Sequence, residues 1–347
     1  MKHFFLIFFL GFLSSFSCNK KPKDNPNPPS PPVPPVIVDT SFFAKGADVS
    51  WVTQMESQGI KFYSKSGTPQ DLFQILKDGG INSIRLRVWV NPPDGWCGTA
   101  DVVAKALRAK AAGMKILIDF HYSDSWADPG QQTKPAAWQN QTITQLDSSV
   151  NAYTTGVLDT LKLNGISPDW VQVGNETNDG MLWPEGRASV SMANFASLIN
   201  AGYDAVKLVF PSTKVIVHLS NGFDNSLFRW MFDGLKSNGA KWDVIGMSLY
   251  PTAATWTQLN AQCLSNMNDM VSRYGKEVMV CEVGMAVSDS VACGNFISDL
   301  IQKSKSVANN KSPGVFYWEP ECYNGWNGYL LGAFNNQGQP TVALNAF

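Results

Sequence analysis

Two glutamates of this sequence, Glu176 and Glu282, stand at the ends of short apolar segments. Glu176 comes three residues after the segment Trp170–Val173, and Glu282 directly follows the segment Lys276–Cys281. The apolar and β-branched residues of both segments predict buried strands, which would carry a terminal carboxylate to the rim of a sheet. Two carboxylates presented in this way can act as a proton donor and a nucleophile. We therefore predict a hydrolase.

The segments around these glutamates belong to a regular alternation of strands and amphipathic helices that begins near Ser41. Eight strands are predicted, at Ala44–Val49, Ser83–Val88, Lys115–Phe120, Trp170–Val173, Lys214–Leu219, Val244–Leu249, Glu277–Cys281 and Gly314–Trp318. Helices are predicted between them, at Pro69–Gly79, Asp101–Gly113, Leu146–Asn164, Ser191–Val209, Leu227–Asn238, Thr257–Tyr274 and Ala292–Ala308. This alternation predicts an α/β fold of the (β/α)₈ TIM barrel type, with one catalytic domain over residues 42–347.

Polar, aromatic and ionisable residues gather at the carboxyl ends of the eight predicted strands, where a (β/α)₈ barrel places its active site. Beside the two glutamates they are Asp48, Arg85, Arg87, Trp89, Asp119, His121, Asn175, His218, Tyr250, Trp318 and Glu319. The opposite ends of the strands carry no comparable set. We therefore expect the functional site at the carboxyl face of the barrel.

The two glutamates suit a retaining glycosidase, which needs a protonated acid and a carboxylate nucleophile about 5–5.5 Å apart. We expect Glu176 to be kept protonated and Glu282 to be ionised. Arg85 is a candidate cation beside the nucleophile, Tyr250 a candidate hydrogen-bond donor to it, and Asn175 a candidate ligand of a sugar hydroxyl. The alternative for one isolated strand-end glutamate is a structural ion pair with an arginine.

Residues 42–347 resemble the arabinogalactan endo-1,4-β-galactosidases, which form glycoside hydrolase family 53 within a large clan of barrel glycosidases. The motifs that carry the resemblance occur in order along the chain. They are Gly46–Ser50, Ile81–Pro92, Asp119–Pro129, Val173–Glu176, Leu182–Pro184, Gly246–Pro251 and Tyr317–Pro320. Two positions depart from the family's usual residues, since Thr177 follows Glu176 where Ile is usual and Val283 follows Glu282 where Thr is usual.

The resemblance implies retaining, endo-acting hydrolysis of β-1,4-galactan, with Glu176 as acid/base and Glu282 as nucleophile. The substrate-binding residues that we predict are Asp48, Arg85, Trp89, His121, Trp126, Asn175, Tyr250 and Trp318. Two alternatives remain open. One is hydrolysis of another β-1,4-glycan, mannan or a glucan, and the other is a non-catalytic glycan-binding lipoprotein on the cell surface.

We predict substrate contact for some of the other aromatic and histidine residues and a packing role for the rest. Trp183 is expected to stack on substrate with the tryptophans named above, and Trp326 is a candidate for a distal subsite. Trp51 and the tryptophans outside the family motifs are assigned to packing, because large aromatic residues dominate core contacts. For His218, a role in the site and a structural role are equally favoured.

The N-terminal residues predict export. Residues 1–17 have a basic start and a short apolar segment, as in a secretory signal peptide, and Ser15–Cys18 resembles a bacterial lipobox, so Cys18 is a predicted lipidation site. A plain cleaved signal is the alternative. Residues 18–41 contain three lysines and eight prolines and predict a disordered tether. We expect a protein that is lipid-anchored to the bacterial outer membrane or cell surface, or otherwise secreted or periplasmic.

The composition limits the classes of partner and cofactor that we expect. The formal net charge is −1, with 27 basic and 28 acidic residues, so nothing favours nucleic acid. Neither the cysteines nor the histidines have a metal-binding spacing, and no metal or other cofactor is expected. Asp124 and Asp128 leave calcium as an alternative, although a structural or substrate-facing hydrogen-bond role is favoured by their place in the family motif. We expect a monomer that acts on a polysaccharide.

Overall fold

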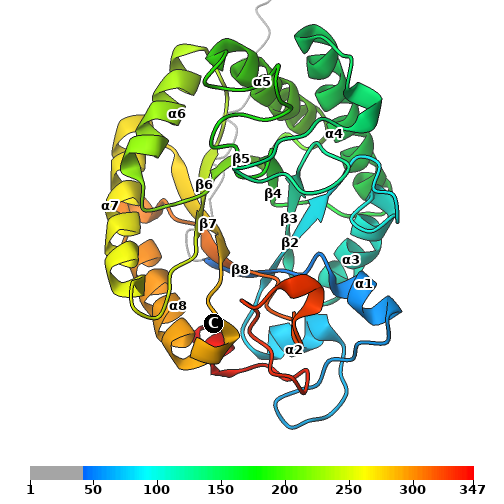
Figure 1. Cartoon of the computed structure of the whole chain (residues 1–347), viewed down its shortest axis with the longest axis vertical. Helices are drawn as coiled ribbons and strands as arrows, with labels where there is room; N and C mark the ends of the chain where they lie inside the picture. The colour runs from blue at the N-terminus through cyan, green and yellow to red at the C-terminus, as the bar shows by residue number, and fades with distance from the viewer. Residues whose placement is uncertain (1–41) are drawn as a thin grey trace, which may run out of the picture. The chain divides into compact units, whose positions relative to one another are not determined.

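The computed structural model describes residues 42–347, which form a closed barrel of eight parallel strands. Each strand pairs with its neighbours in the sequence, and β8 pairs with β1 to close the barrel (Figure 1). The strands are β1 (Ala44–Asp48), β2 (Ser83–Val88), β3 (Lys115–Phe120), β4 (Trp170–Val173), β5 (Lys214–Leu219), β6 (Val244–Leu249), β7 (Glu277–Val283) and β8 (Gly314–Trp318). The predicted (β/α)₈ barrel is therefore confirmed. The predicted signal peptide, Cys18 and the tether lie outside the described residues.

Helices surround the barrel and cover the outer face of its strands (Figure 1). They are α1 (Val52–Ser57), α2 (Leu72–Asp78), α3 (Thr99–Ala111), α4 (Ile143–Leu163), α5 (Met192–Val209), α6 (Asn225–Ser237), α7 (Trp256–Tyr274) and α8 (Ser290–Lys305). Several begin at a side-chain cap: Asp71 accepts from the backbone of α2, Ser191 from that of α5 and Asp224 from that of α6. Only the six-residue α1 has no counterpart among the predicted helices.

Two layers fill the inside of the barrel. The first layer is a compact apolar cluster, whose members include Trp170, Met279 and Phe316. Phe316 packs directly over Gly46, where an added Cβ would lie 2.0 Å from the ring, so the glycine makes room for the phenylalanine. Nearer the carboxyl ends, inward-facing residues are charged instead, and the wholly buried Arg85 is at their centre. The barrel core thus supports a polar floor.

Strand β7 carries an irregularity next to its glutamate. Met247 of β6 is in register with Val280, whereas the following Ser248 is in register with Glu282, so Cys281 is an extra residue on β7. A bulge of this kind turns the following side chain, and bulges are frequent beside active sites. The strand also continues to Val283, two residues beyond its predicted end.

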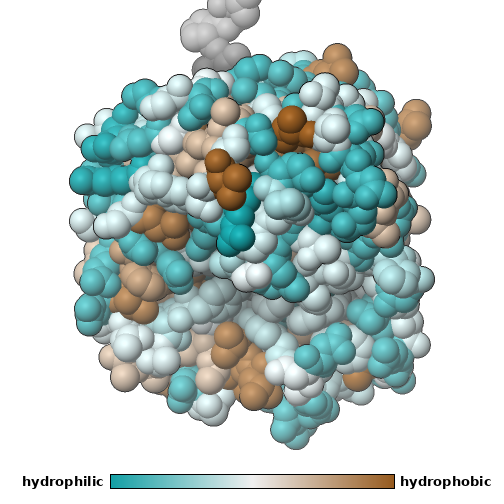
Figure 2. Space-filling model, turned by 45° about the horizontal axis from the view of Figure 1, so that its top comes forward, coloured by the Kyte–Doolittle hydropathy of each residue, from teal (hydrophilic) through white to brown (hydrophobic). Residues whose placement is uncertain are grey.

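The surface of the described part has hydrophobic side chains in small, separate groups among hydrophilic ones on the face shown in Figure 2. Within residues 42–347, no helix has both the length and the apolar composition to cross a membrane. The five cysteines of this part, Cys97, Cys263, Cys281, Cys293 and Cys322, are all buried thiols.

Candidate active site

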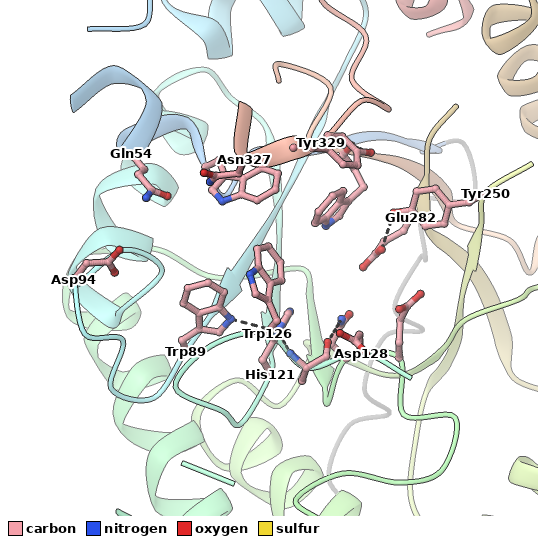
Figure 3. Close-up of a pocket in the computed structure, with 16 residues that line it drawn as sticks. Gln54, Trp89, Asp94, His121, Trp126, Asp128, Tyr250, Glu282, Asn327 and Tyr329 are labelled. Carbon is pink, nitrogen blue, oxygen red and sulfur yellow. Dashed lines mark hydrogen bonds between the residues drawn. The ribbon is translucent and has the colours of Figure 1, made fainter. Parts of the chain in front are cut away.

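A cavity of about 610 Å³ lies at the carboxyl ends of the strands. Figure 3 shows Glu282 and Tyr250 at one end of it and Gln54 and Asp94 at the other. The complete lining is Trp51, Gln54, Trp89, Asp94, His121, Trp126, Ala127, Asp128, Asn175, Glu176, Tyr250, Glu282, Trp318, Asn327, Gly328 and Tyr329. The cavity therefore joins the two glutamates to a wall of aromatic rings.

Glu282 has a cation and a hydroxyl donor on its carboxylate. Arg85 Nη2 lies 2.8 Å from Oε1, and the Tyr250 hydroxyl donates to Oε2 at 2.8 Å. Burial raises the pKa of Glu282, Arg85 lowers it, and the nearby charge of Glu176 raises it again. Arg85 and Tyr250 both stabilise the carboxylate form, which is the form that can attack an anomeric carbon.

Arg85 connects four strands below the cavity floor. Its Nη1 pairs with Asp48 at 2.6 Å, and its Nη2 also bonds Asp119 at 2.8 Å and the amide oxygen of Asn175 at 3.0 Å. Burial disfavours the charged form of Asp119, but Arg85 and His121 together outweigh this effect, so the pKa of that carboxyl is lowered. Arg85 is thus held in place by carboxylates on β1, β3 and β7, and its own charge is compensated.

Glu176 follows β4 on a backbone with φ of +43°, a conformation that non-glycine residues adopt rarely. Burial raises the pKa of Glu176, and a hydrogen bond from Ser248 partly offsets this effect. Within residues 42–347, no cation makes an ion pair with this glutamate. The carboxyl of Glu176 therefore lacks the direct contact to a cation that helps to keep Glu282 ionised.

The two glutamates titrate as a pair, because each negative charge raises the cost of the other. Burial raises the pKa of both, so the pair keeps one proton that isolated glutamates would lose. We assign this proton to Glu176, because only Glu282 has direct contacts to Arg85 and to Tyr250. One acid and one nucleophile result from two side chains of the same type.

His218 supports the proton donor from below. Its Nε2 lies 2.9 Å from the hydroxyl of Ser248, and its Nδ1 lies 3.0 Å from Nε2 of Gln172 and accepts from the backbone N–H of Glu176 at 3.4 Å. Burial lowers the pKa of His218 well below its ordinary value, so the ring is neutral. His218 therefore has a role behind the site, without lining the cavity itself.

Aromatic rings form one wall of the cavity. Trp126 is central: its ring lies edge-on to Trp51 at 5.4 Å, to Trp89 at 5.1 Å and to Trp318 at 5.9 Å between centroids. Tyr329 continues the wall, 4.7 Å from Trp318. Rings of this kind are suited to stacking on the apolar faces of sugars. We define Trp51, Trp89, Trp126, Trp318 and Tyr329 as the aromatic wall.

His121 makes hydrogen bonds to two parts of the site. Its Nδ1 accepts from the indole N–H of Trp89 at 3.3 Å and from the backbone N–H of Ala127 at 3.1 Å, while its Nε2 lies 3.0 Å from Asp119. The imidazole thereby links the aromatic wall to the carboxylates around Arg85. His121 also reaches the cavity itself.

Most of the predicted site residues meet in this one cavity. Those that line it are Glu176, Glu282, Trp89, His121, Trp126, Asn175, Tyr250 and Trp318. Asp48 and Arg85 do not line it, because both are wholly buried. Arg85 contacts the lining residues Glu282 and Asn175 from below, and Asp48 pairs with Arg85. Trp183 also lies outside the lining, with the guanidinium of Arg187 4.4 Å from its ring centroid.

Some lining residues were not predicted from the sequence. Trp51 was assigned to packing, although it lies only three residues after the end of β1, so its position near a strand end was an available signal. Gln54, Asn327 and Tyr329 come from α1 and from the loop after β8, where no periodic pattern points inward. Trp326 itself is not part of the lining, although its neighbours Asn327 and Gly328 are.

The loop that contains Asp124 and Asp128 uses both carboxylates for its own hydrogen bonds. Asp124 accepts from the backbone N–H groups of Asn91 and Ala136, and Asp128 accepts from that of Gly130. Among residues 42–347, no three His, Cys, Asp or Glu side chains converge as a set that could hold a metal ion. The two aspartates thus have structural partners in the loop.

Comparisons with known proteins agree on one family. The model of glycosyl hydrolase family 53 matches residues 44–347. A probable arabinogalactan endo-beta-1,4-galactanase A of Neosartorya fischeri is 38% identical over 306 residues, covering 82% of this chain and 85% of the relative. An arabinogalactan endo-beta-1,4-galactanase of Thermothelomyces thermophilus is 34% identical, covering 87% and 98% respectively.

Solved structures give the same result. A fungal beta-1,4-galactanase superposes with a TM-score of 0.81 at 32% identity, covering 88% of this chain and 98% of its own. The family 53 catalytic domain of Ignisphaera aggregans has a TM-score of 0.80 at 31% identity, covering 90% and 96%. A xylanase of Cellvibrio japonicus, at 12% identity and a TM-score of 0.60, shares the fold.

Proposed function

This chain belongs to glycosyl hydrolase family 53, and from that premise we propose that it cleaves internal β-1,4 bonds of galactan with retention of configuration. The observation that carries the proposal is the unequal setting of the two glutamates. Glu282 contacts Arg85 and Tyr250, whereas the carboxyl of Glu176 has a hydrogen bond from the Ser248 hydroxyl and, within residues 42–347, no ion pair. The galactanase relatives supply the substrate class.

The geometry supports a double displacement. In the first step the Glu282 carboxylate attacks the anomeric carbon while the Glu176 proton passes to the glycosidic oxygen, so the C–O bond breaks and a galactosyl ester of Glu282 forms. In the second step Glu176, now ionised, removes a proton from water, and the hydroxide attacks the same carbon and releases Glu282. The new reducing-end galactose of the released oligosaccharide has the β configuration, and both glutamates return to their starting states.

The aromatic wall and the far end of the cavity support the binding of several sugar units. The lining continues from Glu282 past Trp126 to Gln54 and Asp94 (Figure 3). A substrate chain that spans this length would be cut away from its ends, as the names of the relatives state for those proteins. Chemistry carried by two glutamates needs no redox group or metal, so activity should survive treatment with EDTA.

Hydrolysis of purified galactan, mannan and cellulose side by side tests the substrate. We expect oligosaccharides from galactan and little sugar release from the other two. Release from mannan or cellulose in preference to galactan would support the alternative substrates instead. A surface glycan-binding protein without activity would bind galacto-oligosaccharides tightly and release no product.

We further propose that the protein is exported and anchored by a lipid on Cys18, and that its catalytic domain is a monomer. The support for anchoring is the apolar segment before Cys18 and the lysine- and proline-rich segment after it. In a bacterial host, radioactive palmitate should label the wild-type protein and leave Cys18→Ala unlabelled. Labelling of neither would favour the plain cleaved signal. Sedimentation of residues 42–347 tests the monomer.

A further inference from the structure

A second arginine of β2, Arg87, lies behind the aromatic wall. Like Arg85 it is wholly buried, but its guanidinium faces rings instead of a group of carboxylates. The guanidinium carbon lies 4.4 Å from the ring centroid of Trp126, 4.9 Å from that of Trp51 and 5.4 Å from that of Trp89. All three distances are within the range of cation–π attraction. One charge therefore contacts three of the five residues of the wall.

Arg87 has a single carboxylate in ion-pair contact. Its Nη1 pairs with Oε1 of Glu319, and the other oxygen of Glu319 accepts from the backbone N–H of Trp51 at 3.2 Å. The remaining donors, Nε and Nη2 of Arg87, have no hydrogen-bond acceptor among the residues that the structure describes. The guanidinium is thus attached to the protein frame on one edge, and its other donors are left to the surrounding rings.

The carboxyl group of Glu321 contributes to the net charge of the cluster that contains Arg87 and Glu319. It is wholly buried, and neither of its carboxyl oxygens receives a hydrogen bond from a donor group. Burial raises the pKa of Glu321 well above its ordinary value, and the charge of Glu319 raises it further. Glu321 therefore keeps its proton and donates it to Glu319. The cluster holds one negative charge opposite the positive charge of Arg87.

We propose that Arg87, anchored by Glu319, is a positioning residue that fixes the orientation of Trp51, Trp89 and Trp126 and thereby sets affinity for the glycan chain. This inference rests on the proposed function for its substrate. A ring that stacks on a sugar must present its face at a fixed angle, and the ring of Trp126 contacts the guanidinium of Arg87. Without the guanidinium, the rings could rotate.

A purely stabilising role explains the cluster less well. Burying a guanidinium and a carboxylate has a desolvation cost that their attraction often fails to exceed, and apolar side chains of similar volume are usually as stabilising. Two unbonded donors on Arg87 add to that cost. The charge is therefore better explained by what it contacts, the rings of the aromatic wall.

The test uses the double variant R87M/E319Q, which removes both charges and leaves none uncompensated. The matched control is R229M/D269N, which removes an arginine–aspartate pair between α6 and α7. Neither residue of this pair lines the cavity. For R87M/E319Q we expect KM for galactotetraose to rise about tenfold or more, with a much smaller change in kcat. About tenfold corresponds to 1.4 kcal/mol of binding. The control should change neither constant.

A second cycle tests whether Arg87 acts through the rings. In a W126A background, R87M/E319Q should raise KM by a smaller factor than it does in the wild-type background, because one of the three rings that Arg87 positions is absent. A full additional increase, or an unchanged KM in R87M/E319Q itself, would overturn the proposal. If the double variant does not fold, Arg87→Lys decides, since it keeps the charge and loses the planar contact: KM should rise, and an unchanged KM overturns the proposal.

The near-ultraviolet circular dichroism of tryptophan separates this inference from the proposed function. R87M/E319Q should change that spectrum at a temperature far below its unfolding transition, whatever the substrate of the enzyme is. An unchanged spectrum would overturn the positioning role. Absence of galactan hydrolysis by the wild-type protein would instead overturn the proposed function and leave the spectral result standing.

Discussion

Arg85 Nη2 and Glu282 Oε1 are 2.8 Å apart, and the same arginine also pairs with Asp48 and Asp119. This contact distinguishes the two glutamates of the site, because no cation of the described part of the chain makes an ion pair with Glu176. Arg85 comes from β2 and Glu282 from β7, so the contact crosses the barrel interior, and the closed barrel is what brings the two side chains together. The roles of the glutamates can be tested separately.

Glu282→Ala should abolish attack on the anomeric carbon and reduce hydrolysis of galactan by at least about 10⁴-fold. The substitution leaves space beside Arg85, into which azide can enter as a replacement nucleophile. Added azide should restore cleavage in part and yield the glycosyl azide of inverted configuration, identified by NMR. Glu277→Ala, at the other end of β7 and paired with Lys214 at 2.6 Å, is the matched control and should keep its activity.

Glu176→Ala should slow hydrolysis of the polymer by about 10²–10⁴-fold, because the leaving oxygen no longer receives a proton. An aryl galactoside with an acidic phenol leaving group needs no such proton, so the first step on it should be nearly unaffected. Azide should then give a product of retained configuration, opposite to the result for Glu282→Ala. Equal losses on both substrates would contradict the acid/base role.

The sequence was sufficient to predict the barrel and most of this site, because polar side chains at the ends of apolar strands are a strong signal. The sequence did not predict how deep each inward side chain lies below the cavity. Alternation along β2 shows that Arg85 faces inward, but whether an inward side chain lines the cavity or lies beneath its floor depends on what the other seven strands place there. Asp48 and Arg85 were therefore predicted to touch substrate, although the structure places them below the cavity.

Loop residues could not be predicted for a different reason. Tyr329 and Asn327 reach the cavity from the segment after β8, where backbone conformation, such as the positive φ of Asn327, determines direction. No periodic pattern records that information. Trp51 shows the opposite failure, since its strand-end position was visible and the general tendency of tryptophan to pack in cores was given more weight.

Tyr250→Phe should move the acidic limb of the kcat/KM profile to higher pH. The Tyr250 hydroxyl donates to Glu282 and stabilises the carboxylate, so its loss raises the pKa of the nucleophile. The nucleophile is active when ionised, and a higher pKa means that a higher pH is needed to ionise it. The alkaline limb, which reports the proton of Glu176, should shift far less. A shift of the acidic limb to lower pH would contradict this assignment.

Ser248→Ala should affect the other limb. The Ser248 hydroxyl hydrogen-bonds to Glu176 and lowers its pKa against the effect of burial. Without that bond the acid keeps its proton to higher pH, so the alkaline limb of kcat/KM should move upward. Ser220→Ala is the control, because the Ser220 hydroxyl accepts from Asn178 instead of bonding to Glu176. An equal shift in both variants would show that the hydroxyl of Ser248 is not responsible.

Glu321→Gln should make stability less dependent on pH. In the folded protein burial raises the pKa of Glu321 well above its ordinary value, whereas in the unfolded chain the carboxyl loses its proton near pH 4.5. Folding above that pH therefore takes up a proton, and this group's contribution to stability decreases by about 1.4 kcal/mol for each pH unit, up to the folded pKa. Glutamine cannot ionise, so the variant lacks this decrease.

Chemical denaturation of wild type and Glu321→Gln between pH 4.5 and pH 7 measures the difference. The amide keeps one donor towards Glu319 and adds a second N–H, whose burial contributes a cost that does not vary with pH. The variant should therefore gain stability relative to wild type as pH rises, by up to about 3 kcal/mol across this range, whatever the constant offset. A difference that stays flat would mean that Glu321 is ionised in the folded state, and that the cluster around Arg87 carries a second negative charge.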